Sequence, residues 1–335
     1  MNGIYRAASL EHDSLAGRVR AWLVVSVSVS LALAFANRPR FWWQEFLCNS
    51  VTYWFALLCL FFLWCLRGAI RARFRSPLLG VALLAQIYVC IVVAKQAKPY
   101  LIFNRWPQIE ASSSKVISIL YLDDWNGEST SAHVQEAVQR LHPSLVVISG
   151  RQVADIAHAV AESEYPYRAQ TPASEDGEIR VFSAHPLEAA AIEGLGIEAY
   201  PGGTVRVRVA DTKVVELGAL VLEPSFSTAQ FERNRISTRR LASLMRNSEA
   251  TRIVVANFNA TPFSQFASIY VEQARMRSVF FGRGMERSYD LQSHVVHLLL
   301  NNALVSRDVQ PLLVERVEFP GRSRAGIFLA ARIRL

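Results

Sequence analysis

The sequence predicts a chain of α/β (α+β) class, in which an N-terminal three-helix transmembrane region precedes a domain of packed β-sheets flanked by helices. Three observations support this prediction. The first 97 residues contain three long apolar runs without charge, the remainder contains many short strand-like runs and few helices, and hydrophobic residues make up 51% of the 335-residue chain. A chain of this length holds about two domains at roughly 150 residues each, and a chain this apolar is not disordered.

The positive charge of the chain lies in its first third. Residues 1–105 hold twelve basic and three acidic side chains, a net charge of +9, whereas residues 106–335 hold 24 basic and 25 acidic side chains, a net charge of −1. The basic side chains therefore flank the apolar runs and do not form the basic face that nucleic-acid binding needs. Nucleic acid is not an expected partner. The chain has four cysteines, too few for a scaffold built on disulfides.

The three apolar runs predict membrane spans at about 21–37, 46–66 and 76–94, within a transmembrane region of residues 1–97. A helix needs about 20 residues to cross a bilayer, with about 17 as the short limit. Any one run is compatible with a buried core helix, but three so close together favour a membrane. The first run also has features of a cleavable signal peptide, because Arg18 and Arg20 precede it and Ala34-Phe35-Ala36 ends it. Cleavage after Ala36 would leave two spans and the same placement of the C-terminal part.

Basic residues in short loops predict the orientation of the spans. The strongest signal is the loop between the second and third spans, which contains Arg67, Arg71, Arg73 and Arg75. This loop and the N-terminus are therefore expected on the inner side, and everything after Ala94 on the outer side. Gln86 is the one polar residue in the middle of the third span, so the spans lack the intramembrane charges that mark transporters and channels.

Residues 98–114 are predicted to form a linker, since they contain Pro99, Pro107 and a serine run, and residues 115–335 a folded domain. Apolar periodicity in this domain predicts helices at Ser131–Leu141, Val153–Ala161, Thr228–Arg246 and Phe263–Ala274. Short apolar runs predict strands at Val116–Leu122, Leu145–Ser149, Ile179–Ser183, Thr204–Val209, Val214–Leu222, Arg252–Phe258, Val295–Leu300, Leu312–Val317 and Gly326–Ile333. Because strands outnumber helices after the second strand, two sheets flanked by helices are favoured over a doubly wound sheet.

Several segments resemble the endonuclease/exonuclease/phosphatase superfamily. RIVVANFNATPFS at residues 252–264 is similar to the strand and turn that carry the superfamily's Asp-Phe-Asn motif, and SLVVISG, DGEIRVFSAHPLE, VVHLLLNNALVSRDV and GIFLAARIRL are similar to four further stretches. The resemblance covers essentially all of residues 115–335 and implies a four-layer α/β/β/α sandwich. Three spans ahead of such a domain resemble a membrane-anchored bacterial subgroup. This likeness implies an integral protein of the bacterial inner membrane, with a cytoplasmic N-terminus and a periplasmic C-terminal domain.

The superfamily hydrolyses phosphate esters with Mg²⁺ or Mn²⁺ held by carboxylate and amide oxygens, but this chain departs from that pattern. At positions where the resemblance implies an Asn, a metal-binding Glu, a His and two Asp, the chain has Leu122, Gly150, Val221, Asn257 and Val296. An Asp-His pair is expected before the last strand, where Ala325 stands, and residues 309–335 contain neither residue type. Only Asn259 and His297 survive as relic candidates for catalysis. Catalytic groups that act as a unit fail together.

Other residues leave alternatives open. Asp123, Asp124 and Glu128 follow the first strand of the domain and offer oxygens for a relocated cation, although an acidic turn explains them equally. Asn259 is compatible with a hydrogen bond to its own turn, and His297 with a satisfied core histidine. Arg239 and Arg240 are compatible with a phosphate clamp or with a solvated helix face.

The sequence favours a pseudoenzyme: a membrane-tethered, hydrolase-like domain that has lost catalysis and acts as a binding or scaffolding module at the cell envelope. Its expected partners are the lipid bilayer and an envelope protein or ligand, and no cofactor is expected. The alternative is an active divalent-metal-dependent phosphodiesterase or phosphatase with a rearranged site, which acts on a lipid headgroup or a nucleotide. That alternative requires Mg²⁺ or Mn²⁺.

Overall fold

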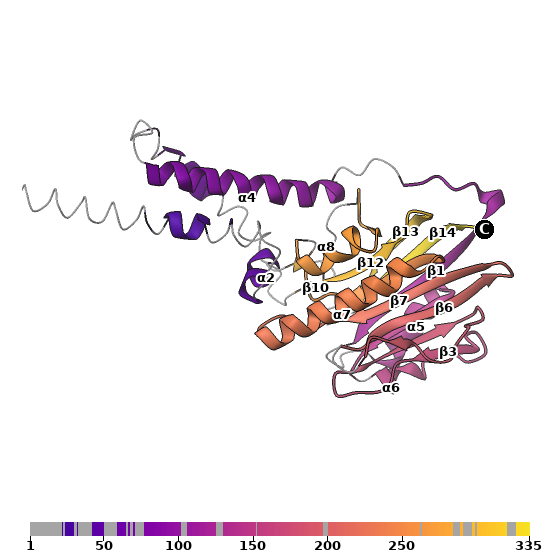
Figure 1. Ribbon diagram of the computed structural model, residues 1–335. Helices are drawn as coiled ribbons and strands as arrows, with labels where there is room; N and C mark the ends of the chain where they lie inside the picture. The colour runs from indigo at the N-terminus through magenta and orange to yellow at the C-terminus, as the bar shows by residue number, and fades with distance from the viewer. Residues whose placement is uncertain are drawn as a thin grey trace, which may run out of the picture. The chain divides into compact units, whose positions relative to one another are not determined.

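The chain divides into two compact units, Met1–Ala97 and Lys98–Leu335. The computed structural model describes residues 22, 24–29, 32, 42–49, 59–64, 66–67, 70 and 77–101. It also describes residues 106–335 apart from 125–129, 152, 197–199, 262, 284–288, 291–296, 299 and 320–325. Figure 1 shows the ribbon of the chain with its helices and strands labelled.

The described residues of the first unit lie in helical segments, most of them apolar. It contains α2 (Trp42–Asn49) and most of α4 (Pro77–Leu101), and residues 24–29 and 59–64 are helical as well. Val24 and Val25 are buried together with Ala82 and Leu83 in one small cluster, against which Phe61 and two further apolar side chains, Phe62 and Leu66, pack. The Gln86 side-chain amide donates a hydrogen bond to the Ser28 hydroxyl at 3.0 Å. The polar residue in the middle of the third apolar run thus has a partner in the first.

Among the described residues, one helical stretch, Gly80–Leu101, is long and apolar enough to cross a membrane. The predicted spans at 21–37 and 46–66 lie partly outside the described residues and stay predictions. The third predicted span ended at residue 94, whereas α4 continues to Leu101 and includes the first four residues of the predicted linker. The helix passes Pro99 because contacts hold its last turn: the Pro99 carbonyl accepts a hydrogen bond from the Gly282 N–H at 2.9 Å.

Six strands form the first sheet of the second unit, in the order β13-β14-β1-β2-β4-β3. Their bounds are β1 Ser114–Asp124, β2 Leu145–Gly150, β3 Tyr167–Gln170, β4 Glu178–Ser183, β13 Val309–Val317 and β14 Gly326–Arg334. β1 and β2 are parallel, and the other neighbours in this sheet are antiparallel. The short 3₁₀ turn Ala111–Ser113 leads into β1.

The second sheet also has six strands, in the order β5-β6-β7-β8-β12-β9. Their bounds are β5 Glu193–Gly194, β6 Gly202–Ala210, β7 Lys213–Val221, β8 Thr251–Asn257, β9 Arg277–Ser278 and β12 Asn301–Val305. β7 and β8 are parallel. β10 (Tyr289–Asp290) and β11 (His297–Leu298) form a separate two-stranded pair.

The two sheets pack face to face, and helices cover their outer faces (Figure 1). Ile119 and Tyr121 of β1 lie in the core between the sheets, whereas Leu120 and Leu122 pack under α5 (Ser131–Leu141) and α6 (Val153–Ala157). α7 (Thr228–Asn247) and α8 (Gln265–Glu272) cover the second sheet. Because both faces of a central strand are buried, its sequence is a continuous apolar run. The expected sandwich of two sheets with flanking helices is confirmed.

Several element bounds differ from the predictions. The predicted helix Val153–Ala161 ends at Ala157, since the chain then tightens into turns in which Val160 bonds back to the Ala157 carbonyl at 3.2 Å. The predicted strand Val295–Leu300 is wrong as a strand of the main sheets, because β12 begins at Asn301 and only His297–Leu298 of that range is described as strand. β3, β5, β9 and β10 were not predicted, as each is short or has few buried residues.

Candidate functional site

The motif positions of the superfamily gather where the parallel strands of both sheets end. In the first sheet Asp124 of β1 lies in register with Gly150 of β2, and in the second sheet Val221 of β7 lies in register with Asn257 of β8. Carboxyl ends of parallel strands meet at one edge, which in open α/β sheets is the usual place for a ligand. The region where these four strand ends meet is therefore the candidate functional site, and we call it the cleft.

Asn257 links the two sheets at the base of this cleft. Its side chain is fully buried, and its amide nitrogen donates a hydrogen bond to the carboxylate of Asp123 on β1 at 2.7 Å. Its amide oxygen accepts the backbone N–H of Asn259 at 2.8 Å. Both polar ends of Asn257 are thus used inside the protein, and one oxygen of the buried Asp123 receives a hydrogen bond that an aspartate at position 257 would be unable to donate.

Asn259 shapes the turn after β8. Its φ angle is +43°, in the left-handed region that asparagine tolerates better than most residues. Its side-chain amide donates to the Leu222 carbonyl at the end of β7. This bond reaches the end of β7 and not the turn itself, so both interpretations of Asn259 stay predictions.

Gly150 occupies the position where the superfamily implies a metal-binding glutamate. Its φ angle is +148°, in a region that glycine adopts and L side chains rarely do. The backbone packs closely here as well, because a Cβ on Gly177 (φ +99°) would lie 2.4 Å from the Gly150 carbonyl oxygen. The backbone at this strand end is therefore shaped for glycine.

Ion pairs connect the rims of the cleft. Arg151, directly after β2, pairs with Glu223, just beyond β7, at 3.1 Å. The Glu223 carboxylate also accepts the Tyr200 hydroxyl at 2.8 Å. Arg233 of α7 pairs with Asp176 in the turn before β4, and its guanidinium lies 4.1 Å from the centre of the Tyr200 ring. This rim network of Arg151, Asp176, Tyr200, Glu223 and Arg233 joins the first sheet to the second across the cleft.

The network changes the acidity of its members. Burial, the hydrogen bond to Glu223 and the charge of that carboxylate raise the pKa of Tyr200 above its ordinary value, so the phenol keeps its proton and donates. The hydrogen bond that Arg233 donates to the Asp176 carboxylate raises the pKa of Arg233. Sequence reasoning missed Glu223. The one available signal was an acidic residue immediately after the apolar run 217–222 at the end of β7.

Tyr200→Phe is expected to lower the free energy of unfolding of the second unit by about 1 kcal/mol, because it removes one hydrogen bond to a partly buried carboxylate. Hydrogen exchange of the β7 amides in the full chain measures this loss. Tyr167→Phe is the matched control, since the Tyr167 side chain is 39% exposed and no change is expected there. Equal exchange in the two variants would show that the Tyr200 hydroxyl contributes nothing.

The remaining predicted site residues are not gathered in the cleft. His297 lies in β11, where its register partner is Asp290 of β10. It belongs to neither of the six-stranded sheets. Glu128, Val296 and Ala325 lie outside the described residues. Arg240 donates to the Leu195 carbonyl at 2.7 Å, and the phosphate clamp with Arg239 stays a prediction.

The donor chemistry of the cleft does not fit Mg²⁺ or Mn²⁺ at the superfamily's positions. Leu122, Gly150 and Val221 have no side-chain oxygen, and hard cations require oxygen ligands. Within the part of the chain that the structure describes, no three or more His, Cys, Asp or Glu side chains form a group that could hold a metal ion.

Solved structures share this fold. An endonuclease/exonuclease/phosphatase from Beutenbergia cavernae matches with a TM-score of 0.53 and 13% identity, over 66% of this chain and 72% of the other. A humanized D. rerio TDP2 matches with a TM-score of 0.50 and 14% identity, over 64% and 98%. D. rerio TDP2 in complex with a single-strand DNA product matches with a TM-score of 0.50 and 11% identity, over 65% and 99%. At these identities the likeness shows the fold alone. No family profile and no curated protein matches the chain.

Proposed function

We propose that this chain is a membrane-tethered, non-hydrolytic member of the endonuclease/exonuclease/phosphatase fold group, and that it acts as a binding or scaffolding module at the cell envelope. The observation that carries the proposal is the cleft, in which the protein's own groups occupy the positions of a hydrolytic site. Asn257 is bonded to Asp123, Gly150 replaces the metal carboxylate, and Arg151 places a positive charge against Glu223.

The tether is proposed from the surface of α4. A helix that is apolar on all sides is buried either in protein or in lipid. Only 22% of the most apolar window of Gly80–Leu101 is buried in protein, and large side chains such as Leu84 and Ile91 are exposed. Lipid is therefore the proposed cover. The Gln86–Ser28 hydrogen bond supports the same proposal, since polar pairs of this kind hold transmembrane helices together. The predicted orientation places the second unit in the periplasm.

The proposal predicts that the full chain, purified in detergent, does not hydrolyse bis(p-nitrophenyl) phosphate above the buffer rate with 5 mM Mg²⁺ or Mn²⁺. The physical reason is that a water nucleophile and a leaving group lack the metal and carboxylate charges that stabilise them. Mn²⁺ should likewise leave the melting temperature unchanged, because a ligand that does not bind cannot stabilise.

An active superfamily enzyme assayed in the same detergent controls for the assay, and Asp123→Asn controls for adventitious activity. Turnover that depends on Mn²⁺ and falls in Asp123→Asn would overturn the proposal. It would favour the alternative, a rearranged phosphodiesterase that uses the buried Asp123.

A further inference from the structure

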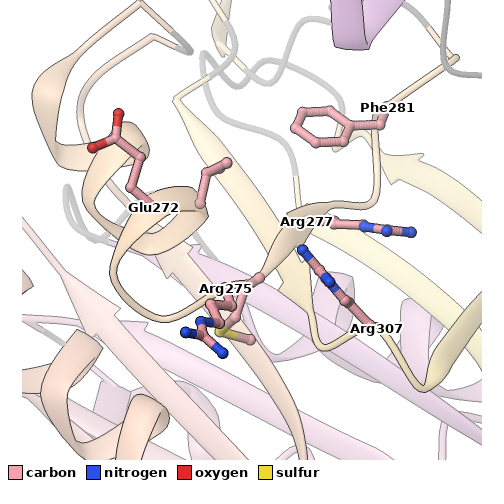
Figure 2. A pocket seen from close by; sticks show the side chains of 7 residues that line it. Glu272, Arg275, Arg277, Phe281 and Arg307 are labelled. Carbon is pink, nitrogen blue, oxygen red and sulfur yellow. The ribbon is translucent and has the colours of Figure 1, made fainter.

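A second concave site lies at the other end of the second sheet from the cleft. The pocket has a volume of about 430 Å³, and its lining includes Arg275, Arg277, Arg307, Glu272, Met276 and Phe281 (Figure 2). Arg277 in β9 is in register with Val305 of β12, which in turn pairs with Ile253 near the beginning of β8. Asn257, at the cleft, ends the same β8 strand. The two sites are therefore separated by most of the strand, at about 3.3 Å per residue.

The pocket concentrates positive charge on a domain that has no net positive charge. Its lining holds three arginines and one acid, whereas residues 106–335 together carry a net charge of −1. Figure 2 shows the Arg277 and Arg307 side chains close together, with the Glu272 carboxylate on the far side of the pocket. Burial and the neighbouring charge of Arg307 lower the pKa of Arg277. Two guanidinium groups at short range repel each other, and an anion between them removes that repulsion.

Two of these arginines, Arg275 and Arg307, make no ion pair with any residue that the structure describes. The acid that follows Arg307, Asp308, accepts hydrogen bonds from the Thr251 and Ser306 hydroxyls. Arg252, behind the pocket, donates to the Met245 and Ala274 carbonyls at 2.7 and 3.1 Å. The charges of Arg275 and Arg307 are thus left for a ligand.

The pocket adjoins the place where the chain leaves α4. The Phe281 ring packs edge-on against the Tyr100 ring with a centroid distance of 4.9 Å, and the Gly282 N–H bonds to the Pro99 carbonyl. Pro99 and Tyr100 belong to the last turn of the one described helix that is apolar enough to cross a bilayer. The last turn of that helix, which belongs to the same compact unit as the pocket, therefore links the pocket to the proposed membrane tether.

We propose that this pocket binds the phosphate of an anionic phospholipid headgroup in the bilayer that holds α4. Arg277 and Arg307 donate charge-assisted hydrogen bonds to the phosphate oxygens, a geometry that guanidinium groups favour. Phe281 and Met276 provide apolar surface for the glycerol and upper acyl carbons. The charged part of the ligand thus meets the arginines of the pocket, and its apolar part meets the apolar side chains. This inference rests on the membrane tether of the proposed function.

The test uses the full chain in detergent, titrated with phosphatidylglycerol or phosphatidylcholine and followed by native mass spectrometry. We expect phosphatidylglycerol adducts at lower lipid concentration than phosphatidylcholine adducts. R277A/R307A should weaken phosphatidylglycerol binding about 30-fold. Each basic group near anionic lipid contributes about a fivefold change in affinity, and the two factors multiply. R206A/R208A is the matched control: it removes the same two charges from β6, where both arginines pair with Glu188, and should leave lipid binding unchanged.

Three outcomes would count against the pocket. Equal losses in the two double variants would indicate non-specific attraction, equal binding of both lipids would remove the anion preference, and displacement of phosphatidylglycerol by millimolar inorganic phosphate would assign the pocket to a soluble anion. The tether is tested separately by flotation of the full chain with vesicles of phosphatidylcholine alone. A chain that floats in that assay but shows no difference between the variants contradicts the pocket alone, and a chain that does not float contradicts the tether.

Discussion

Asn257→Asp is expected to destabilise the second unit by about 3 kcal/mol at pH 7, although the substitution changes one amide into a carboxylate of the same shape. The parent side chain donates a buried hydrogen bond to Asp123. The variant places a second carboxylate against that acid, which removes the donor and adds repulsion between two buried like charges. Breaking one buried charged interaction typically costs this much.

The loss should depend on pH in a defined direction. Two carboxylates that share a buried site cannot both ionise, so the pKa of one of them rises above its unfolded value. A group whose pKa is raised in the folded state contributes stability below the unfolded value, and that stability is lost as the pH rises through the folded value. The variant should therefore lie closest to the parent near pH 4 and fall furthest below it at pH 7.

Denaturant-dependent hydrogen exchange of the β8 amides in the full chain measures both effects. Asn302→Asp is the matched control, because Asn302 is also a buried asparagine in the second sheet, where its oxygen accepts the Ser278 hydroxyl at 2.8 Å. An aspartate at position 302 keeps an acceptor oxygen for the Ser278 hydroxyl. An Asn257→Asp variant as stable as the parent, or one that binds Mn²⁺ at micromolar concentration, would contradict the role assigned to Asn257.

The strands that build the cleft could be predicted because their apolar runs are local signals. Leu145–Ser149 and Arg252–Phe258 correspond to β2 and β8 within a residue or two at each end. β12 was missed since it begins with Asn301 and Asn302, which are polar and buried, and their burial depends on partners elsewhere in the chain. β3 was missed because only one of its four residues is buried.

The contacts that fill the cleft could not be predicted, because the residues that make them are far apart in the sequence. Asn257 lies 134 positions from Asp123, and Arg151 lies 72 positions from Glu223. Neither pair has a local pattern, since each depends on how the two sheets stack. The sequence did identify the substitutions at Gly150 and Asn257. It contained no sign that the protein's own side chains bridge the resulting space.

Gly150→Glu, which returns the carboxylate that the superfamily resemblance implies, is expected to destabilise the fold without creating a metal site. Gly150 has a φ angle of +148°, and forcing an L residue into such a region costs about 1–3 kcal/mol. Gly150→Ala should show this backbone cost alone. The glutamate should lose about 2 kcal/mol more, because it buries a carboxylate at a strand end in register with Glu178.

The double variant Gly150→Glu/Asn257→Asp tests why the cleft does not bind a metal ion. It distinguishes missing acidic side chains from a backbone that cannot direct them. If only side chains had changed, restoring both acids would produce Mn²⁺ binding and a measurable phosphodiesterase rate. The φ angle of Gly150 and the Arg151–Glu223 pair argue against this, because the first misdirects a restored carboxylate and the second holds a guanidinium at the rim. We therefore expect no Mn²⁺ response in calorimetry and no turnover. A double variant that folds, binds Mn²⁺ and hydrolyses bis(p-nitrophenyl) phosphate would show that the cleft is two substitutions away from an enzyme.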